Sequence, residues 1–371
     1  MYFGIDAHSA EREGEGNATY SRNLIESLLA APGGDEFALF AGHPEHPWYR
    51  ALSSPGRTRV VRVAQGRGLL RFGFTLGRAA SRERVGAIHT QYQAPLGYAG
   101  PLVVTVHDLA FLHVPESFPA TLRLALSVLV RRSVARASRI IVDSEFVRQD
   151  VMARYGVGPE RIVAIPLGAG PRFRPLDGDE IARILARYDL RPGFVFSLGR
   201  LNRRKNLEQL LIAYGRLRAA GVSEAPLVIG GKPDFGVEAV FRRARLSMDD
   251  SGVRFMGVIP DDDLPAFYGA AACFAYPSLF EGFGLPVLEA MACGAAVVTS
   301  RRTALPELVG DAGLLIDPES ADDLAAAIAR LLGDRALVRE LGQRGLARSR
   351  RYSWADTARR TLDIYRQVAS R

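Results

Sequence analysis

Short apolar runs typical of buried strands alternate with segments of helical periodicity through most of the chain. In the first half, the predicted strands cover residues 2–7, 37–42, 59–63, 87–92, 102–107, 139–143 and 161–165. In the second half, they cover residues 194–199, 226–230, 253–258, 273–276, 295–299 and 313–316. This alternation is typical of the α/β class, in which helices cover parallel sheets.

Three of the predicted helices have clear apolar faces. The first begins near Asn17, an N-cap residue type, and its inward face carries Tyr20, Leu24, Ile25 and Leu28. The second begins at Leu207, and its inward face carries Leu210, Leu211, Tyr214 and Leu217. Ser353 is suited to cap the last helix, whose apolar side carries Trp354, Leu362 and Tyr365.

The length of 371 residues predicts two domains, because single cores stop growing at roughly 250–300 residues. Residues 168–179 are rich in turn formers and have neither period, which places the linker there. We expect an N-terminal Rossmann-like domain over 1–170, a C-terminal Rossmann-like domain over 171–351, and a final helix over 352–371 that packs back on the first domain. Two doubly wound domains of this kind would face their crevices toward each other across a cleft.

The formal net charge of +8 is compatible with nucleic acid, an anionic membrane face or an acidic substrate. No basic stripe with interleaved aromatic residues is visible, so we expect no nucleic-acid partner. Arginines gather on one predicted helix beside apolar residues, at Arg123, Arg131, Arg132, Arg136, Arg139, Leu122, Leu126, Leu129 and Val130. This pattern fits either docking on anionic lipid or, as we favour, a solvated basic face above a stripe packed in the core.

Met1 to Asp6 reads as a first strand and has no basic leader, and no span reaches the ~20 apolar residues that cross a bilayer. Cys273 and Cys293 lie in apolar surroundings without metal-ligand spacing, so we expect two buried thiols. These features favour a cytoplasmic protein, and the basic helix would allow peripheral contact with the inner face of the cell membrane.

The most informative segment spans residues 277–292, PSLFEGFGLPVLEAMA. Pro286 suits the first turn of a helix, which places Glu281 in the preceding loop and Glu289 about one turn inside. The glycines around Phe283, Gly284 and Leu285 allow a ligand to approach, and amides at a helix N-terminus bind phosphate or sugar oxygens. A carboxylate accepts hydrogen bonds from vicinal hydroxyls, as binding a sugar or a ribose requires.

Two further groups carry candidate chemistry. The turn after the strand ending at Leu198 reads GRLNRRKN over 199–206, and fixed cations there suit a diphosphate. His107 lies at the carboxyl end of a strand, where α/β sites are built, and can donate a hydrogen bond to a sugar hydroxyl or to a leaving phosphate.

Residues 281–292 resemble the Glu-x7-Glu signature of the retaining glycosyltransferases of family 4, which have the GT-B fold. The turn at 199–206 is similar to the phosphate-clamping turn of that family, and His107-Asp108-Leu109 is similar to its contact with the donor sugar. The resemblance implies catalytic roles for His107, Glu281, Arg200 and Lys205. It implies substrate binding by Gly16, Asp108, Phe283, Gly284, Leu285 and Glu289.

The resemblance implies transfer of a hexose from a nucleotide sugar to a glycan or lipid-linked acceptor, with the anomeric configuration retained. GDP-mannose is the first choice of donor and a UDP-hexose the second, and no cofactor or metal is implied. A nucleotide-sugar epimerase on the same fold stays open as an alternative. Asp261, Asp262 and Asp263 precede a predicted helix, where we expect them to cap it and not to bind metal.

Overall fold

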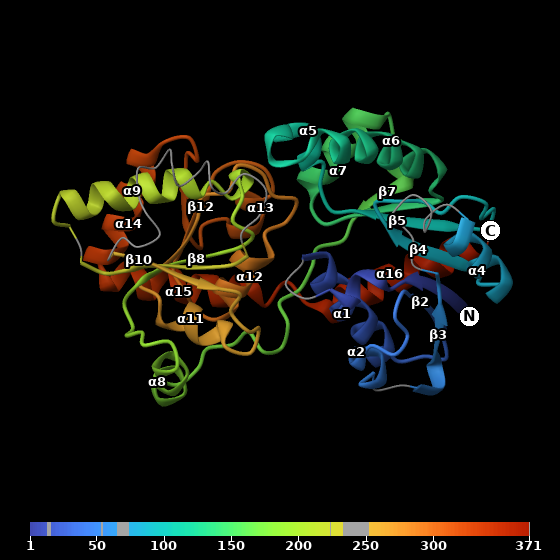
Figure 1. The fold of residues 1–371 in the computed structure, drawn as a ribbon, viewed down its shortest axis with the longest axis horizontal. Coiled ribbons are helices and arrows are strands. Elements are labelled where there is room, and N and C mark those ends of the chain that lie inside the picture. The colour runs from blue at the N-terminus through green and yellow to red at the C-terminus, as the bar shows by residue number, and fades with distance from the viewer. Residues whose placement is uncertain (13–15, 53–54, 65–73, 223, 233–251, 371) are drawn as a thin grey trace. The chain divides into compact units, whose positions relative to one another are not determined.

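The computed structural model describes residues 1–12, 16–52, 55–64, 74–222, 224–232 and 252–370. Within these ranges the chain forms two compact units, each built around its own sheet (Figure 1). Unit 1 comprises residues 1–109, 121–168 and 353–371, and unit 2 comprises residues 110–120 and 169–352. Residues 110–120, which include α5 (Ala110–His113), belong to unit 2. The His113 ring at the end of α5 stacks on the Phe280 ring with centroids 4.8 Å apart.

The sheet of unit 1 has seven parallel strands in the order β3-β2-β1-β4-β5-β6-β7. Its strands are β1 (Tyr2–Asp6), β2 (Glu36–Ala41), β3 (Thr58–Arg62), β4 (Ala87–Gln91), β5 (Leu102–Val106), β6 (Arg139–Val142) and β7 (Ile162–Ala164). β1 lies inside the sheet and pairs Ile5 with Leu39 on one side and with His89 on the other. The apolar runs therefore predicted each of these strands to within two residues.

The longer helices of unit 1 are α1 (Gly16–Ala30), α4 (Leu76–Glu83), α6 (Ala120–Arg136), α7 (Glu145–Tyr155) and α16 (Trp354–Ala369), and α2 (Pro47–Arg50) is a single turn. Helix α16 packs beside α1, and the Thr357 hydroxyl donates to the Pro166 carbonyl at 2.7 Å. Ser353 caps α16, as predicted, by accepting from the Asp356 amide. Helix α1 begins at Gly16, so Asn17 lies in its first turn and is not the cap.

The sheet of unit 2 has six parallel strands in the order β10-β9-β8-β11-β12-β13. The strands are β8 (Val195–Leu198), β9 (Leu227–Gly230), β10 (Val253–Gly257), β11 (Cys273–Tyr276), β12 (Val297–Ser300) and β13 (Leu314–Ile316). The helices are α8 (Gly178–Ala186), α9 (Leu207–Ala219), α11 (Leu264–Ala270), α12 (Leu285–Ala292), α13 (Leu305–Val309), α14 (Ala321–Gly333) and α15 (Arg335–Ser349).

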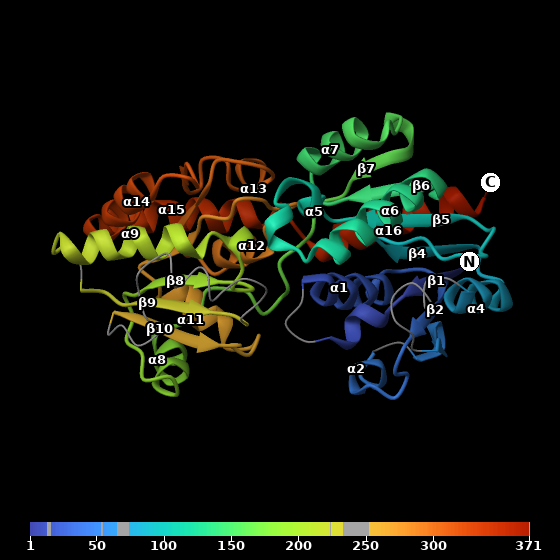
Figure 2. The same ribbon diagram turned by 45° about the horizontal axis from the view of Figure 1, so that its top comes forward.

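Helices cover both faces of the second sheet, as the turned view shows (Figure 2). On one face, α9 and α14 bury Leu210 and Leu324 against β8, β9 and β11. On the other, α11 places Phe267 and Tyr268 against the rings of Phe196 and Phe274. The inward residues expected on α9 are all buried, and Cys273 and Cys293 are free buried thiols, as expected. The sheet is thereby held rigidly between two apolar layers.

The apolar stripe predicted on the arginine-rich helix is only partly packed in the core. Val130 of α6 is buried, but Leu126 and Leu129 are half-buried and Leu122 is exposed. The first turns of α6 therefore present apolar side chains at the surface, and the expected core-packed stripe is wrong there. In the part of the chain that the structure describes, no helix is long and apolar enough to span a bilayer.

Candidate active site

The strand order of unit 2 reverses between β8 and β11, and ligands of open α/β sheets bind at the carboxyl ends of such neighbours. The basic turn 199–206 follows β8, and the loop 277–284 follows β11. The two segments touch, because the Leu279 amide donates to the Arg204 carbonyl at 2.8 Å. A Cβ at Gly231 would lie 1.8 Å from the Gly199 carbonyl oxygen, so only glycine allows the basic turn to pack this closely.

Glu281 lies at the centre of this arrangement and is almost fully buried. Its Oε1 accepts hydrogen bonds from Lys205 Nζ at 2.6 Å, from the Ser278 hydroxyl at 2.6 Å and from the Tyr276 hydroxyl at 3.0 Å. Arg204 Nη1 lies 3.8 Å from Oε2. Burial alone raises the pKa of this carboxyl, but Lys205, Arg204 and Ser278 outweigh it and lower the pKa to about 2. The side chain is therefore a fixed carboxylate at neutral pH.

The basic turn contributes its cations from a short 3-10 helix, Arg203–Lys205, which the Asn202 side chain caps. Lys205 Nζ lies 4.9 Å above the Tyr276 ring and also donates to the Tyr276 hydroxyl. Arg200 is exposed at the start of the turn. The structure thus brings Lys205 to Glu281 and leaves Arg200 at the surface of the same turn.

The second glutamate of the signature lies inside α12, whose N-cap is Gly284 at φ +103°. Gly284 has no side chain, so it supplies no N-cap oxygen to the amides of the first turn. Glu289 is buried and accepts a hydrogen bond from the Tyr268 hydroxyl at 3.1 Å. Burial, together with the nearby Asp261 charge, raises the pKa of Glu289 to about 8, against the opposing effects of Tyr268 and Arg172.

His107 lies at the carboxyl end of β5 in unit 1, between two acceptors. Its Nδ1 is 2.7 Å from Asp143 Oδ2, and its Nε2 is 2.9 Å from Gln91 Oε1. Gln91 in turn donates to the hydroxyls of Ser9 and Ser21. Burial raises the pKa of Asp143 although His107 opposes the shift. The ring is therefore held at the strand end by partners on both nitrogens.

The remaining candidates in unit 1 are Asp108 and Gly16. The Asp108 amide donates to the Tyr92 hydroxyl at 3.2 Å. Gly16 is the exposed first residue of α1, and a Cβ there would meet nothing within 4 Å, so no packing requires glycine at this position. Glu13, Gly14 and Glu15, which belong to the same predicted loop, lie outside the described residues.

The comparisons with known proteins agree on one family. Residues 182–348 match the family model of glycosyl transferases group 1, and residues 15–171 match that of glycosyltransferase family 4. The chain is 34% identical over 265 residues to O-antigen chain mannosyltransferase B of Escherichia coli, covering 71% of this chain and 70% of that one. The chain belongs to glycosyltransferase family 4. It is a glycosyltransferase similar to mannosyltransferases.

Two further comparisons concern a second relative and the fold of this glycosyltransferase. It is 32% identical over 293 residues to the MMP alpha-(1->4)-mannosyltransferase of Mycolicibacterium hassiacum, covering 75% of this chain and 67% of that one. The sucrose-phosphate synthase of Thermosynechococcus elongatus has the same fold, with a TM-score of 0.79 at 24% identity over 100% of this chain and 99% of that one. The predicted GT-B fold, with two Rossmann-like parallel sheets, is thus confirmed.

Three residues around Glu281 were not singled out from the sequence. Tyr276, Ser278 and Arg204 all contact Glu281. Arg204 stands inside the basic turn that the sequence marked, so its charge was the available signal. Tyr276 is the last residue of a predicted strand, and a hydroxyl at a carboxyl strand end is the feature that would have pointed to it.

Asp263 stands at the start of a helix as expected, but its side chain does not cap that helix. Asp263 is the N-cap residue of α11, but its side chain accepts no amide of that helix. It accepts instead from Arg187 and from the Tyr188 hydroxyl, both at 2.5 Å, because these side chains reach it from the segment after α8. Among the described residues, no group of three or more acidic, histidine or cysteine side chains could hold a metal ion.

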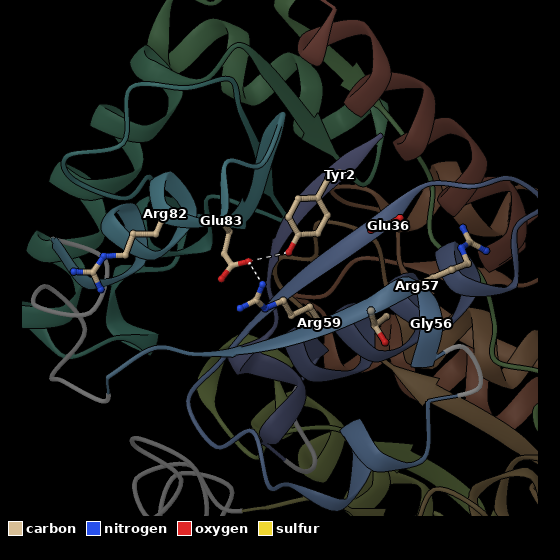
Figure 3. Close-up of a pocket in the computed structure, with 8 residues that line it drawn as sticks. Tyr2, Glu36, Gly56, Arg57, Arg59, Arg82 and Glu83 are labelled. Atoms are coloured by element: carbon tan, nitrogen blue, oxygen red, sulfur yellow. Dashed lines mark hydrogen bonds and ion pairs between the residues drawn. The ribbon is translucent and has the colours of Figure 1, made fainter.

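A cavity of ≈ 530 Å³ lies elsewhere in this glycosyltransferase, at the amino ends of β1, β2 and β3 (Figure 3). Two of its charged side chains form an ion pair: Glu83 lies 3.4 Å from Arg59 and also accepts from the Tyr2 hydroxyl at 3.0 Å. Ligands of this sheet class bind at the opposite, carboxyl ends of the strands. The cavity is therefore not the site that the motifs define.

Proposed function

We propose that this glycosyltransferase moves mannose from GDP-mannose to a hydroxyl of a growing or lipid-linked glycan and retains the anomeric configuration of the donor. The arrangement around Glu281 carries the proposal: a fixed carboxylate and the Lys205 ammonium meet at the switch point of unit 2. A carboxylate suits the hydroxyls of a sugar, and cations suit its diphosphate. The similarity to two mannosyltransferases favours mannose over the sugar of a UDP-hexose.

The leaving group is the centre of the proposed mechanism. As the bond between C1 of the sugar and the phosphate oxygen breaks, negative charge grows on the diphosphate, and Lys205 and Arg200 offset it. The acceptor hydroxyl attacks C1 from the same face, and its proton passes to the departing phosphate oxygen. Glu281 orients the sugar and Glu289 orients the ribose, and the assignment of His107 to the donor sugar rests on the resemblance to the family.

The remaining substrate-binding residues lie in two places in the sequence: at the N-terminus of α12, and at the start of α1 and the end of β5. The amides around Phe283, Gly284 and Leu285 would bind diphosphate or sugar oxygens at the N-terminus of α12. Gly16 would border the donor, and Asp108 would bind the substrate. These assignments rest on the resemblance to the family together with the positions described above.

The anomeric configuration of the product tests the proposed reaction. We expect GDP-mannose, an α-linked donor, to give an α-mannoside with a panel of mannoside acceptors, as measured by NMR. A β-mannoside would contradict retention. A donor isomerised without transfer would instead indicate the epimerase.

We further propose that the enzyme works in the cytoplasm and contacts the anionic inner face of the cell membrane through α6. The side chains of Leu122, Leu124 and Val128 are 46%, 68% and 60% exposed, and Arg123 is exposed among them. Apolar side chains beside cations are the combination that binds an anionic bilayer surface. Such contact would bring the enzyme to an acceptor carried on lipid.

A further inference from the structure

The two oxygens of Glu281 have different surroundings. Oε1 accepts from three donors, Lys205, Ser278 and Tyr276, whereas Oε2 has the Arg204 guanidinium at 3.8 Å. Three donors saturate a carboxylate oxygen, since each oxygen offers about two lone-pair sites. A sugar hydroxyl that binds Glu281 must therefore donate to Oε2. The direction in which Oε2 points depends on the donors that hold Oε1.

Tyr276 is the donor best placed to set that direction. Its hydroxyl donates to Glu281 Oε1 and accepts from Lys205 Nζ, so it contacts both charged groups. Its backbone is held at the end of β11, where the carbonyl accepts from the Thr299 hydroxyl at 2.7 Å. Its ring stacks on Phe274 with centroids 5.7 Å apart, and the whole residue is buried. The phenol is thus fixed by the sheet, whereas the Lys205 side chain is long and flexible.

We propose that the Tyr276 hydroxyl is a positioning group of the donor site: it holds the Lys205 ammonium and Glu281 Oε1 together and thereby directs Glu281 Oε2 to a hydroxyl of the transferred sugar. The inference rests on the proposed function of Glu281 and adds what orients it. Ser278 supports the same orientation with a hydrogen bond of 2.6 Å to the same oxygen. Positioning of this kind acts on the reacting geometry more than on binding of the nucleotide.

Tyr276→Phe tests the proposal, because it removes the hydroxyl and keeps the ring beneath Lys205. We expect kcat for donor turnover to fall about 10- to 100-fold, while the dissociation constant of the free nucleoside diphosphate changes less than about threefold. Tyr214→Phe is the matched control: its hydroxyl donates to the carbonyls of Ala225 and Gly252, in the core beside α9. It loses the same group and should retain wild-type kcat.

A mutant cycle with Glu281→Gln shows whether Tyr276 acts through Glu281. In the Glu281→Gln background, Tyr276→Phe should lower kcat less than about threefold, because the carboxylate that the Tyr276 hydroxyl orients is already absent. If Tyr276→Phe fails to fold, Ser278→Ala is the second variant. It should lower kcat and leave the dissociation constant of the nucleoside diphosphate nearly unchanged. A kcat within about threefold of wild type in Tyr276→Phe, or an equal loss in both backgrounds, would overturn the proposal. A wild-type enzyme that turns over no nucleotide sugar would instead overturn the proposed function itself.

Discussion

Glu281 and Glu289 are eight positions apart in one motif and have opposite electrostatic surroundings. Lys205 and Arg204 lower the pKa of Glu281 to about 2, whereas burial raises the pKa of Glu289 to about 8. Glu281 is therefore charged before a ligand arrives, but Glu289 is largely protonated at neutral pH. A ribose that donates hydroxyls to Glu289 would favour its ionised form, so nucleotide binding would be linked to loss of a proton.

Nucleotide affinity should therefore depend on pH through Glu289. We expect the affinity for the free nucleoside diphosphate to rise by up to tenfold per pH unit between pH 7 and 8 and to level above pH 8, because only the carboxylate accepts two hydroxyls. Glu289→Gln should remove this dependence and weaken binding at pH 9 by about 1–3 kcal/mol. Calorimetric titration of both proteins across this range measures the effect.

Stability provides the control for this variant. Between the unfolded pKa near 4.3 and the folded pKa of about 8, the folded protein holds the Glu289 proton that the unfolded chain has released. Stability of the wild type therefore falls as pH rises through this window, and Glu289→Gln lacks this loss. The melting temperature of the variant should thus rise relative to wild type from pH 5 to 8. If Glu289→Gln lowers the melting temperature and leaves nucleotide affinity unchanged, Glu289 stabilises α12 and does not bind the nucleotide.

The cations of the basic turn should matter for turnover, and Lys205→Ala should also lower the melting temperature because it leaves the buried Glu281 carboxylate without its ammonium partner. We expect Lys205→Ala and Arg200→Ala each to lower turnover about 10²-fold or more, because both offset charge on the departing diphosphate. Arg216→Ala is a matched control, since Arg216 pairs with Asp322 on the surface of α9 and α14. Steady-state kinetics with melting temperatures measure the three variants. Turnover within about threefold of wild type in both Lys205→Ala and Arg200→Ala would contradict the diphosphate assignment.

At the scale of elements, the apolar face of α6 leads to a separate prediction. Replacing Leu122, Leu124 and Val128 by serine should reduce co-sedimentation with vesicles rich in phosphatidylglycerol and leave donor hydrolysis in solution unchanged, because these side chains are exposed on unit 1. Neutral phosphatidylcholine vesicles should bind the wild type weakly, since Arg123 and Arg131 need an anionic surface. Equal binding of wild type and variant to the anionic vesicles would exclude α6 as the contact.

Local sequence patterns predicted the positions of helices and strands better than they predicted which side chains contact each other. Apolar runs located the strands of the described residues, because the inner strands lie buried between two layers of helices. Ser353 caps α16 because a cap depends on neighbours three residues away. Asp263 was misjudged because its partners Arg187 and Tyr188 come from 75 residues or more earlier in the chain. Tyr276 was missed for the same reason: Lys205 lies 71 positions away, and only the sheet order brings them together.

At the scale of the whole molecule, the motifs divide between the two units. His107, Asp108 and Gly16 belong to unit 1, and the Glu281 cluster, Arg200 and Glu289 belong to unit 2. The doubly wound pattern and the family motifs were sufficient to predict two sheets and the residues at their carboxyl ends. The failure on α6 has a physical cause, because apolar periodicity marks a face that avoids water or binds a partner, without telling which.

A chelator should leave activity unchanged, because the proposed mechanism assigns the leaving diphosphate to Lys205, Arg200 and the N-terminus of α12. We expect equal rates of donor turnover before and after EDTA treatment followed by gel filtration. Loss of activity that manganese restores would show a metal-dependent reaction. It would contradict the proposal that Lys205 and Arg200 offset the charge of the leaving diphosphate.

The central claim is that unit 2 turns over a nucleotide sugar at Glu281 and Lys205. Release of nucleoside diphosphate from a panel of donors, with GDP-mannose and UDP-glucose among them, tests it with wild type and Glu281→Gln side by side. We predict turnover of GDP-mannose in preference to UDP-hexoses, and a loss of about 10²-fold or more in Glu281→Gln. No release from any donor, or equal release by wild type and Glu281→Gln, would contradict the account.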